Sequence, residues 1–213
     1  MLMEKYYENQ NDITNRMRII LVDWLYEVCS VYKIDDYIYM KIIFYLDKFI
    51  EKHDNIERTN FQAVGLCCIL LSTDIMSYDK CVYVSDHTYT KEHLIKLKDI
   101  ISNNLSNIYF LCNKNKINKI DSELIYFVST NDILFSKFLE NSTLLLNIQK
   151  NKNIDYNFYT DLLEWYENKI IKIWPRYNQK KIWILLKRYF NFMPNFYSPN
   201  NKKQINKNLP III

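Results

Sequence analysis

The stretch from Met17 to Val28 constrains the fold more than any other part of this chain. A tryptophan, an acid and an arginine stand at helical spacing inside an apolar run. At 3.6 residues per turn the run forms two adjacent stripes. These stripes consist of Arg18, Val22, Leu25 and Cys29, and of Met17, Leu21, Trp24 and Val28. We therefore expect a helix with one stripe toward a core and the other toward a groove.

Arg18 lies on the stripe expected to face the core, so it needs a partner. An unpaired buried charge is costly, and arginine cannot neutralise itself by losing a proton. Asp47, on the next apolar helix, is the candidate partner. We predict a structural ion pair between Arg18 and Asp47; the alternative is that Arg18 is an ordinary surface arginine.

Composition favours a helical protein with buried cores. The 213 residues include one glycine and four prolines, which is little of the turn chemistry that an all-β fold needs. No apolar run approaches the ~20 residues that cross a bilayer, and the N-terminus lacks the pattern of a secretory signal. We expect an intracellular protein, in the nucleus or cytoplasm, with no membrane partner.

Charge and reactive residues point away from nucleic acid, metal and catalysis. The net charge of +4 is spread without a basic block, so nucleic-acid binding is not indicated. The five cysteines form no CxxC pair, which favours buried thiols over disulfides or a metal site. Of the three histidines, His93 is expected at the solvated surface. A single glycine excludes the glycine-rich phosphate and nucleophile motifs. We predict no catalytic residue, metal or cofactor, and interpret the chain as a binding protein.

Apolar periodicity predicts the elements of a first helical domain. The expected helices lie near residues 17–32, 37–52, 59–77 and 91–105, with a short segment at 81–86. Gly65 lies inside the third helix among small residues, which suits a central helix that its neighbours approach closely. The alternative is a glycine in a surface helix. Thr90 is the expected N-cap of the fourth long helix.

A polar run at residues 113–119 offers little to bury and is predicted to be a linker or loop. Beyond it we expect helices near residues 121–130, 132–148, 157–174 and 179–192, and an irregular tail. The expected divisions are a lead-in at 1–16, a first domain at 17–110, a linker at 111–120, a C-terminal helical lobe at 121–193 and a tail at 194–213.

The opening helix resembles that of a cyclin box. The family signature Met-Arg-x-x-Leu-Val-Asp-Trp-Leu-x-Glu-Val is complete at residues 17–28, and residues 10–16 resemble the lead-in of A- and B-type cyclins. Stretches at 45–49, 62–65 and 85–91 agree in order and spacing. The resemblance covers roughly residues 6–110. It implies an all-α cyclin fold, with a five-helix cyclin box followed by a second, divergent or reduced helical lobe.

The resemblance also implies a shallow apolar groove that docks Arg-x-Leu-type peptides of substrates or inhibitors. In such a groove Trp24 and aliphatic side chains take the leucine, Glu27 attracts the basic residue and Gln62 hydrogen-bonds the peptide backbone. The alternative is that the apolar members are core packing. The matching positions are Met17, Ile20, Leu21, Trp24, Glu27, Phe61 and Gln62.

A second implied surface contacts a cyclin-dependent protein kinase, and here the chain departs from the family pattern. Cyclins carry a lysine and a glutamate at positions that are Asp74 and Lys98 in this chain, so both charges are reversed. If the two side chains are adjacent, the reversal inverts the potential presented to a partner. The alternative is an ordinary solvated pair. Ile75, Asp99 and Ser102 complete the predicted kinase interface.

The resemblance implies a regulatory subunit that binds and activates a divergent cyclin-dependent kinase in cell-cycle control. It would hold the kinase C-helix inward, while the catalytic residues belong to the kinase. One alternative is a cyclin-fold scaffold or adaptor that assembles a complex without activating a kinase. Another is a transcription-factor-type cyclin-fold protein that binds DNA or polymerase machinery, against which the missing basic patch and the A/B-type lead-in argue.

Overall fold

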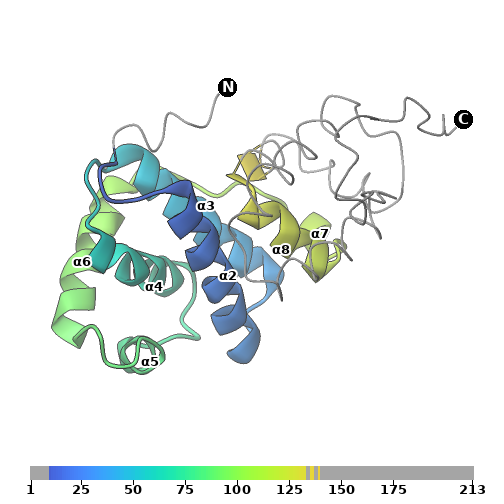
Figure 1. Ribbon diagram of the computed structural model, residues 1–213. Helices are drawn as coiled ribbons and strands as arrows, with labels where there is room; N and C mark the ends of the chain where they lie inside the picture. Colours follow the sequence, from blue (N-terminus) through green and yellow to red (C-terminus); the bar gives the residue numbers. More distant parts are fainter. Residues whose placement is uncertain (1–9, 133–134, 137–138, 140–213) are drawn as a thin grey trace, which may run out of the picture.

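Figure 1 shows a computed structural model of the chain, which describes residues 10–132, 135–136 and 139. All regular structure within these residues is helical. None of the described helices is long and apolar enough to span a membrane. The elements in chain order are α2 (Asn15–Val31), α3 (Asp36–Lys52), the 3-10 turn η1 (Arg58–Asn60), α4 (Phe61–Ser72), α5 (Tyr78–Val84), α6 (Lys91–Asn104), α7 (Lys114–Ile117) and α8 (Ser122–Thr130).

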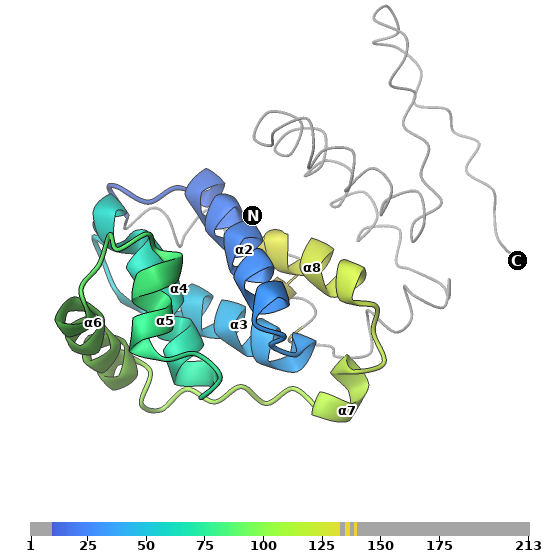
Figure 2. The ribbon, with the colours of Figure 1, turned by 90° about the horizontal axis from the view of Figure 1, so that it is seen from below.

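Helix α4 forms the centre of the first bundle. It packs against α3 and α6 and also contacts α2, an arrangement visible in Figures 1 and 2. A Cβ atom placed on Gly65 would lie 3.1 Å from Cδ1 of Leu21 and 3.3 Å from Cδ2 of Leu25. That spacing is tighter than an ordinary carbon–carbon contact of 3.5–4.0 Å. The predicted close approach of a neighbouring helix at Gly65 is confirmed.

Side-chain caps fix the starts of several helices. Thr14, Asp35 and Thr90 each accept a hydrogen bond from the backbone N–H three residues on, at 3.3, 2.8 and 3.2 Å. Each such cap satisfies one of the amide groups that the first turn of a helix leaves unpaired, and is worth about 1 kcal/mol. The prediction of Thr90 as an N-cap is confirmed.

The third predicted helix, 59–77, is too long. Helix α4 ends at Ser72 because Thr73 adopts an extended backbone, with φ −156° and ψ 151°. Met76 lies in the segment that connects α4 to α5, and its side chain is buried. It therefore extends the apolar pattern of the sequence without extending the helix. Ser77 then caps α5 by accepting from the backbone N–H of Lys80 at 3.3 Å, so this helix starts before the predicted 81.

The predicted linker at 111–120 contains a helical turn with a buried anchor. Helix α7 begins after Asn113, whose side chain accepts from the backbone N–H of Lys116 at 3.3 Å. Ile117 is fully buried, so one apolar side chain in a lysine- and asparagine-rich run fixes the turn against the bundle. Lys114 also pairs with Asp35 at 3.0 Å.

Helix α8 confirms the predicted helix at 121–130. It packs beside α2 and against α3 (Figure 2). Its residues from Leu124 to Thr130 are all buried. Of the predicted helix at 132–148, only residues 132, 135–136 and 139 are described. The predicted helices at 157–174 and 179–192 and the tail at 194–213 lie outside the described residues.

The lead-in joins the bundle through Gln10. Its Nε2 donates to the carbonyl oxygens of Ile50 and His53 at 3.1 and 2.5 Å, and the backbone N–H of Ile56 donates to its Oε1 at 2.9 Å. Gln10 is buried. The described part of the lead-in is therefore attached to the end of α3 and the segment that follows it.

Candidate docking and partner-binding surfaces

A groove opens between α2 and the start of α4. Its volume is about 380 Å³, within the range of sites that hold several ligand side chains. Leu21 and Phe61 are buried at its base, whereas Ile20 is 51% exposed. The side chains that line it are Met17, Ile20, Leu21, Trp24, Arg58, Phe61 and Gln62.

The groove unites six of the seven docking positions expected from the sequence. Met17 and Trp24 are only half-buried, so they pack against the core on one side and leave the other side open. Glu27 does not line the groove; it is exposed one turn further along α2 from Trp24. Arg58, on η1, also lines the groove. Its place there could not be predicted from the sequence, because an exposed arginine carries no apolar signal.

The lining of the groove combines apolar and hydrogen-bonding side chains. Aromatic and aliphatic side chains form a concave apolar surface, and Gln62 brings an amide with a donor and an acceptor to its wall. Two charged residues accompany this surface: Arg58 lines the groove, and Glu27 is exposed one turn beyond Trp24 on α2.

Arg18 and Asp47 form a bidentate ion pair, the pair expected from the sequence. Nε of Arg18 is 2.7 Å from Oδ1 of Asp47, and Nη2 is 2.7 Å from Oδ2. Arg18 is 1% exposed, so the surface alternative for this arginine is wrong. Two parallel charge-assisted bonds hold α2 to α3 with defined geometry.

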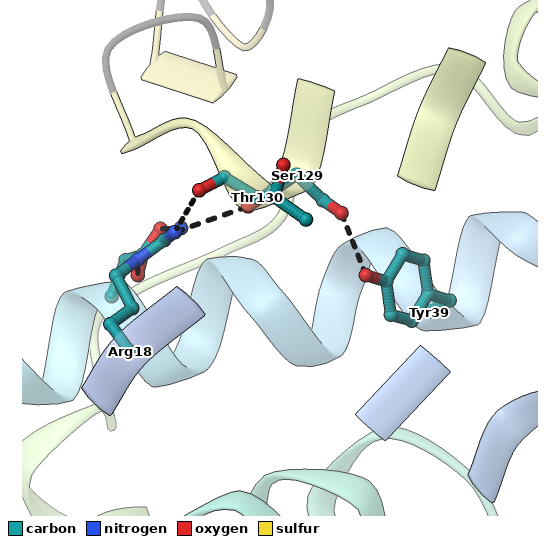
Figure 3. Close-up of polar contacts among 5 residues, drawn as sticks. Arg18, Tyr39, Ser129 and Thr130 are labelled. Atoms are coloured by element: carbon teal, nitrogen blue, oxygen red, sulfur yellow. Dashed lines mark hydrogen bonds and ion pairs between the residues drawn. The ribbon is translucent and has the colours of Figure 1, made fainter. Parts of the chain in front are cut away.

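The remaining terminal nitrogen of Arg18 extends this connection to α8. Nη1 donates to the carbonyl oxygens of Ser129 and Thr130 at 3.1 and 3.3 Å, as Figure 3 shows. These are carbonyls of the last turn of α8, which lack acceptor pairing within the helix and carry its partial negative charge. Figure 3 also shows the hydroxyl of Tyr39 at 2.6 Å from that of Ser129.

A second polar contact joins α8 to α2. The Tyr126 hydroxyl donates to Oδ1 of Asp23. Burial, followed by the charge of Asp23, raises the pKa of Tyr126 above its ordinary value, and Glu27 adds to the effect. The phenol therefore remains a donor at neutral pH, and the Asp23 and Glu27 carboxylates create a negative potential beside this end of α2.

The charge-reversed positions do not form an ion pair with each other. Among the residues described, the structure shows no ion pair between Asp74 and Lys98; Asp74 is exposed and Lys98 is half-buried. The Lys98 Nζ lies 5.9 Å from the centre of the Tyr78 ring, a cation–π contact. That contact places the middle of α6 beside the start of α5, three residues after Ile75.

The other predicted kinase-contact residues are also at the surface. Ile75 is 44% exposed, and both Asp99 and Ser102 are exposed on α6. Spacings of three and four residues put Ile95, Lys98, Asp99 and Ser102 on one side of that helix. Ile95 is 38% exposed and was not singled out from the sequence, since one apolar residue in a polar helix looks like part of the core pattern.

Comparison with known proteins identifies the family to which this chain belongs. Residues 1–107 match the family described as "Cyclin, N-terminal domain", which is half of the 213 residues. The chain belongs to the cyclin family. Its described helices form an all-α cyclin fold, and the opening-helix signature that predicted it lies inside the matched region.

Individual cyclins match about half of this cyclin chain. It is 38% identical to cyclin-A1 of Carassius auratus over 98 residues, which is 44% of this chain and 25% of the relative. It is 32% identical to cyclin-B2-4 of Arabidopsis thaliana over 105 residues, 47% of this chain and 24% of the relative. Cyclin-A2 of Homo sapiens is 34% identical over 101 residues, 45% and 23% of the two chains. The match thus spans about a quarter of the length of these relatives.

A solved structure shows the same fold at low sequence identity. The viral cyclin from Herpesvirus saimiri superposes with a TM-score of 0.54 and 17% identity, covering 86% of this chain and 90% of the viral one. At that identity the likeness shows the fold alone.

The thiols and histidines of this cyclin form no chemical site among the residues described. All five cysteines are free, and no cluster suited to a metal ion occurs there. Burial raises the pKa of Cys67 and of Cys81 to about 12, so both thiols are protonated at neutral pH. His93 corrects the sequence expectation of a solvated surface residue, because it is half-buried and its ring stacks on Tyr89 at 5.6 Å.

Proposed function

We propose that this cyclin is the regulatory subunit of a cyclin-dependent protein kinase and recruits substrates through the groove beside Trp24. The observation that carries the docking function is the groove itself, an open apolar concavity with half-buried Met17 and Trp24 on its wall. Side chains that only fill a core leave no such space. A peptide leucine in this concavity would be removed from water. It would also cover apolar surface of Met17 and Trp24 that the described part of the chain leaves exposed.

The proposed kinase interface is the surface that joins the start of α5 to the exposed side of α6. Ile75 and Ile95 offer apolar contact area there, and the Tyr78 ring holds Lys98 at the middle of the surface. The charges of Asp74 and Lys98 are the reverse of the family pattern. A kinase with complementary charges must therefore present an acidic group to Lys98 and a basic group to Asp74, because like charges across an interface cost several kcal/mol.

In the proposed mechanism this chain contributes position and no reacting group. Binding beside the kinase N-lobe would hold the C-helix inward, so that the kinase's own lysine–glutamate pair and metal-binding aspartate are in place. The groove would raise the local concentration of substrates that carry a cation two residues before a leucine. The chain is thus proposed to act in the nucleus or cytoplasm as a regulator in cell-cycle control, without enzymatic activity of its own.

Direct binding to purified kinases tests this proposal. The full chain is titrated against each cyclin-dependent kinase of its source organism by calorimetry, alongside the double variant Asp74→Lys/Lys98→Glu. One kinase should bind the native chain in the micromolar range or tighter, and the double variant should bind it at least tenfold more weakly. Undiminished binding by the double variant would remove these two residues from the interface. Absence of binding to every kinase would contradict the regulatory-subunit proposal.

The charge reversal also favours a second candidate, a scaffold that assembles a complex without activating a kinase. A surface that repels conventional kinases is compatible with a cyclin fold that retained its docking groove alone. The two candidates differ in one measurement, because a scaffold would bind Arg-x-Leu peptides through the groove and leave the activity of every kinase unchanged.

A further inference from the structure

The groove beside Trp24 is open within the described part of the chain, and the sequence contains a segment that matches its chemistry. The segment is Lys207-Asn-Leu-Pro-Ile211. We propose that this segment docks in the groove of its own chain and competes there with substrate peptides. This inference rests on the proposed docking function, because it assigns an occupant to the same site.

Side-chain spacing selects this segment. A lysine or arginine stands two residues before a leucine at only two places in the 213 residues, Lys137-Phe-Leu139 and Lys207-Asn-Leu209. Leu139 packs against the hydrophobic core of the described residues, so the leucine of the first copy already has packing partners. The second lies outside the described residues. We therefore take Lys207-Asn-Leu209 as the candidate segment.

The charge of the segment is complementary to that of Glu27. Residues 191–213 contain Lys202, Lys203 and Lys207 and no aspartate or glutamate. Asp23 and Glu27 lie on successive turns of α2, and Glu27 is exposed one turn beyond Trp24. Arg58 lines the groove at η1. A lysine is therefore attracted toward Glu27 and repelled from Arg58, which leaves the apolar surface beside Trp24 for a leucine two residues further on.

The residues after the lysine suit an extended bound peptide. Proline biases the residue before it toward extended backbone, so Leu209 loses less conformational freedom when it binds than it would without Pro210. Ile211 alternates with Leu209, which adds a second apolar side chain at the spacing of an extended segment. An amide such as that of Gln62 on the groove wall can hydrogen-bond the backbone of a segment in this conformation.

Tethering makes even a weak contact effective. About 67 residues separate Leu139 from Lys207, and an extended chain of that length spans at most roughly 220 Å, so reach does not exclude the groove. A tethered segment has an effective concentration up to the millimolar range. If the isolated segment binds with a dissociation constant of about 100 µM, the tethered one weakens a competing peptide roughly tenfold.

Peptide binding to full-length variants tests the proposal. A fluorescent ten-residue peptide with one Arg-Ala-Leu-Phe segment is titrated with the native chain and with Lys207→Ala/Leu209→Ala, and anisotropy is read. The double variant should bind the peptide about tenfold more tightly than the native chain. Trp24→Ala, added to that double variant, should abolish the binding. The matched control Lys202→Ala/Gln204→Ala removes the same charge outside the segment and should bind like the native chain.

The possible results separate this inference from the function on which it rests. Equal and measurable affinity for the native chain and the Lys207/Leu209 variant would overturn self-docking and leave the groove as a docking site. No binding to any variant would overturn the docking function of the groove, and the inference with it. Sedimentation of the native chain should show a monomer. A dimer that the Lys207/Leu209 variant loses would replace docking within one chain by docking between two copies.

Discussion

Arg18 and Ser129, 111 positions apart in the sequence, are joined by a hydrogen bond of 3.1 Å from the guanidinium Nη1 to the backbone carbonyl oxygen. The same guanidinium holds Asp47 with its other two nitrogens at 2.7 Å. One side chain therefore connects α2, α3 and α8. The first helix bundle and the helix that follows the α7 turn share this buried polar contact.

Arg18→Ala should be strongly destabilising. It leaves the Asp47 carboxylate and two carbonyl groups of α8 without their donor, and breaking one partner of a buried ion pair typically costs about 3–5 kcal/mol. Urea unfolding monitored by circular dichroism measures the change. The control is Lys91→Ala, which removes an exposed ion pair with Asp79 at 3.5 Å and should cost no more than about 0.5 kcal/mol. Similar losses for the two variants would contradict the account of Arg18.

Gly65→Val should destabilise the fold and disturb the groove. Its added carbons would enter space already occupied by Leu21 and Leu25, and overpacking of this kind typically costs about 1–3 kcal/mol. Leu21 is also part of the groove, so peptide affinity should fall together with stability. Thermal unfolding and peptide anisotropy measure both effects. Gly65→Ala is the matched smaller change, and a Gly65→Val protein as stable as native would show that α2 and α4 are not in close contact.

Trp24→Ala and Glu27→Lys should weaken peptide binding for different reasons. Loss of the tryptophan removes apolar contact area and should reduce affinity by roughly 30-fold or more, as expected for a central aromatic residue. Glu27→Lys should reduce affinity only for peptides with the basic residue, and less in high salt. Val31→Ala, an exposed change on the same helix, serves as the control. Equal effects of Glu27→Lys on basic and neutral peptides would remove Glu27 from the recognition of charge.

The buried thiols should resist alkylation in the folded state. At pH 8 a thiol whose pKa is about 12 is only about 10⁻⁴ thiolate, and thiolate is the reactive form. Cys67 and Cys81 should therefore react with iodoacetamide far more slowly than Cys112, which is half-buried and has a pKa raised to about 11. Mass spectrometry after timed quenching measures the order. In urea all five should react alike, and rapid native labelling of Cys67 would contradict its burial.

The contacts that involve two side chains could be predicted from the sequence better than those that involve backbone. The stripe that carries Arg18 indicated a buried guanidinium, and an apolar helix with one aspartate supplied its partner. The carbonyl acceptors of Ser129 and Thr130 leave no trace in the sequence, because every residue has a carbonyl group. The link between α2 and α8 could therefore be found only in the structure.

Short helical turns and exposed charged residues were also difficult to predict from the sequence. One isoleucine, Ile117, anchors α7 inside a run that otherwise reads as solvated. Met76 carries the apolar pattern past the end of α4 and lengthened the predicted helix. Six groove residues followed from the resemblance to cyclins, whereas Arg58 did not, since its place depends on how η1 turns toward α2.

The central claim is that this chain activates a kinase, and phosphate transfer by a purified pair tests it most directly. Each cyclin-dependent kinase of the source organism is assayed on a proline-directed peptide with and without the native chain, and with Asp74→Lys/Lys98→Glu as a comparison. The account predicts that one kinase gains activity by at least a hundredfold with the native chain and clearly less with the double variant. Binding of a kinase without any gain in activity would contradict the claim and establish the scaffold alternative.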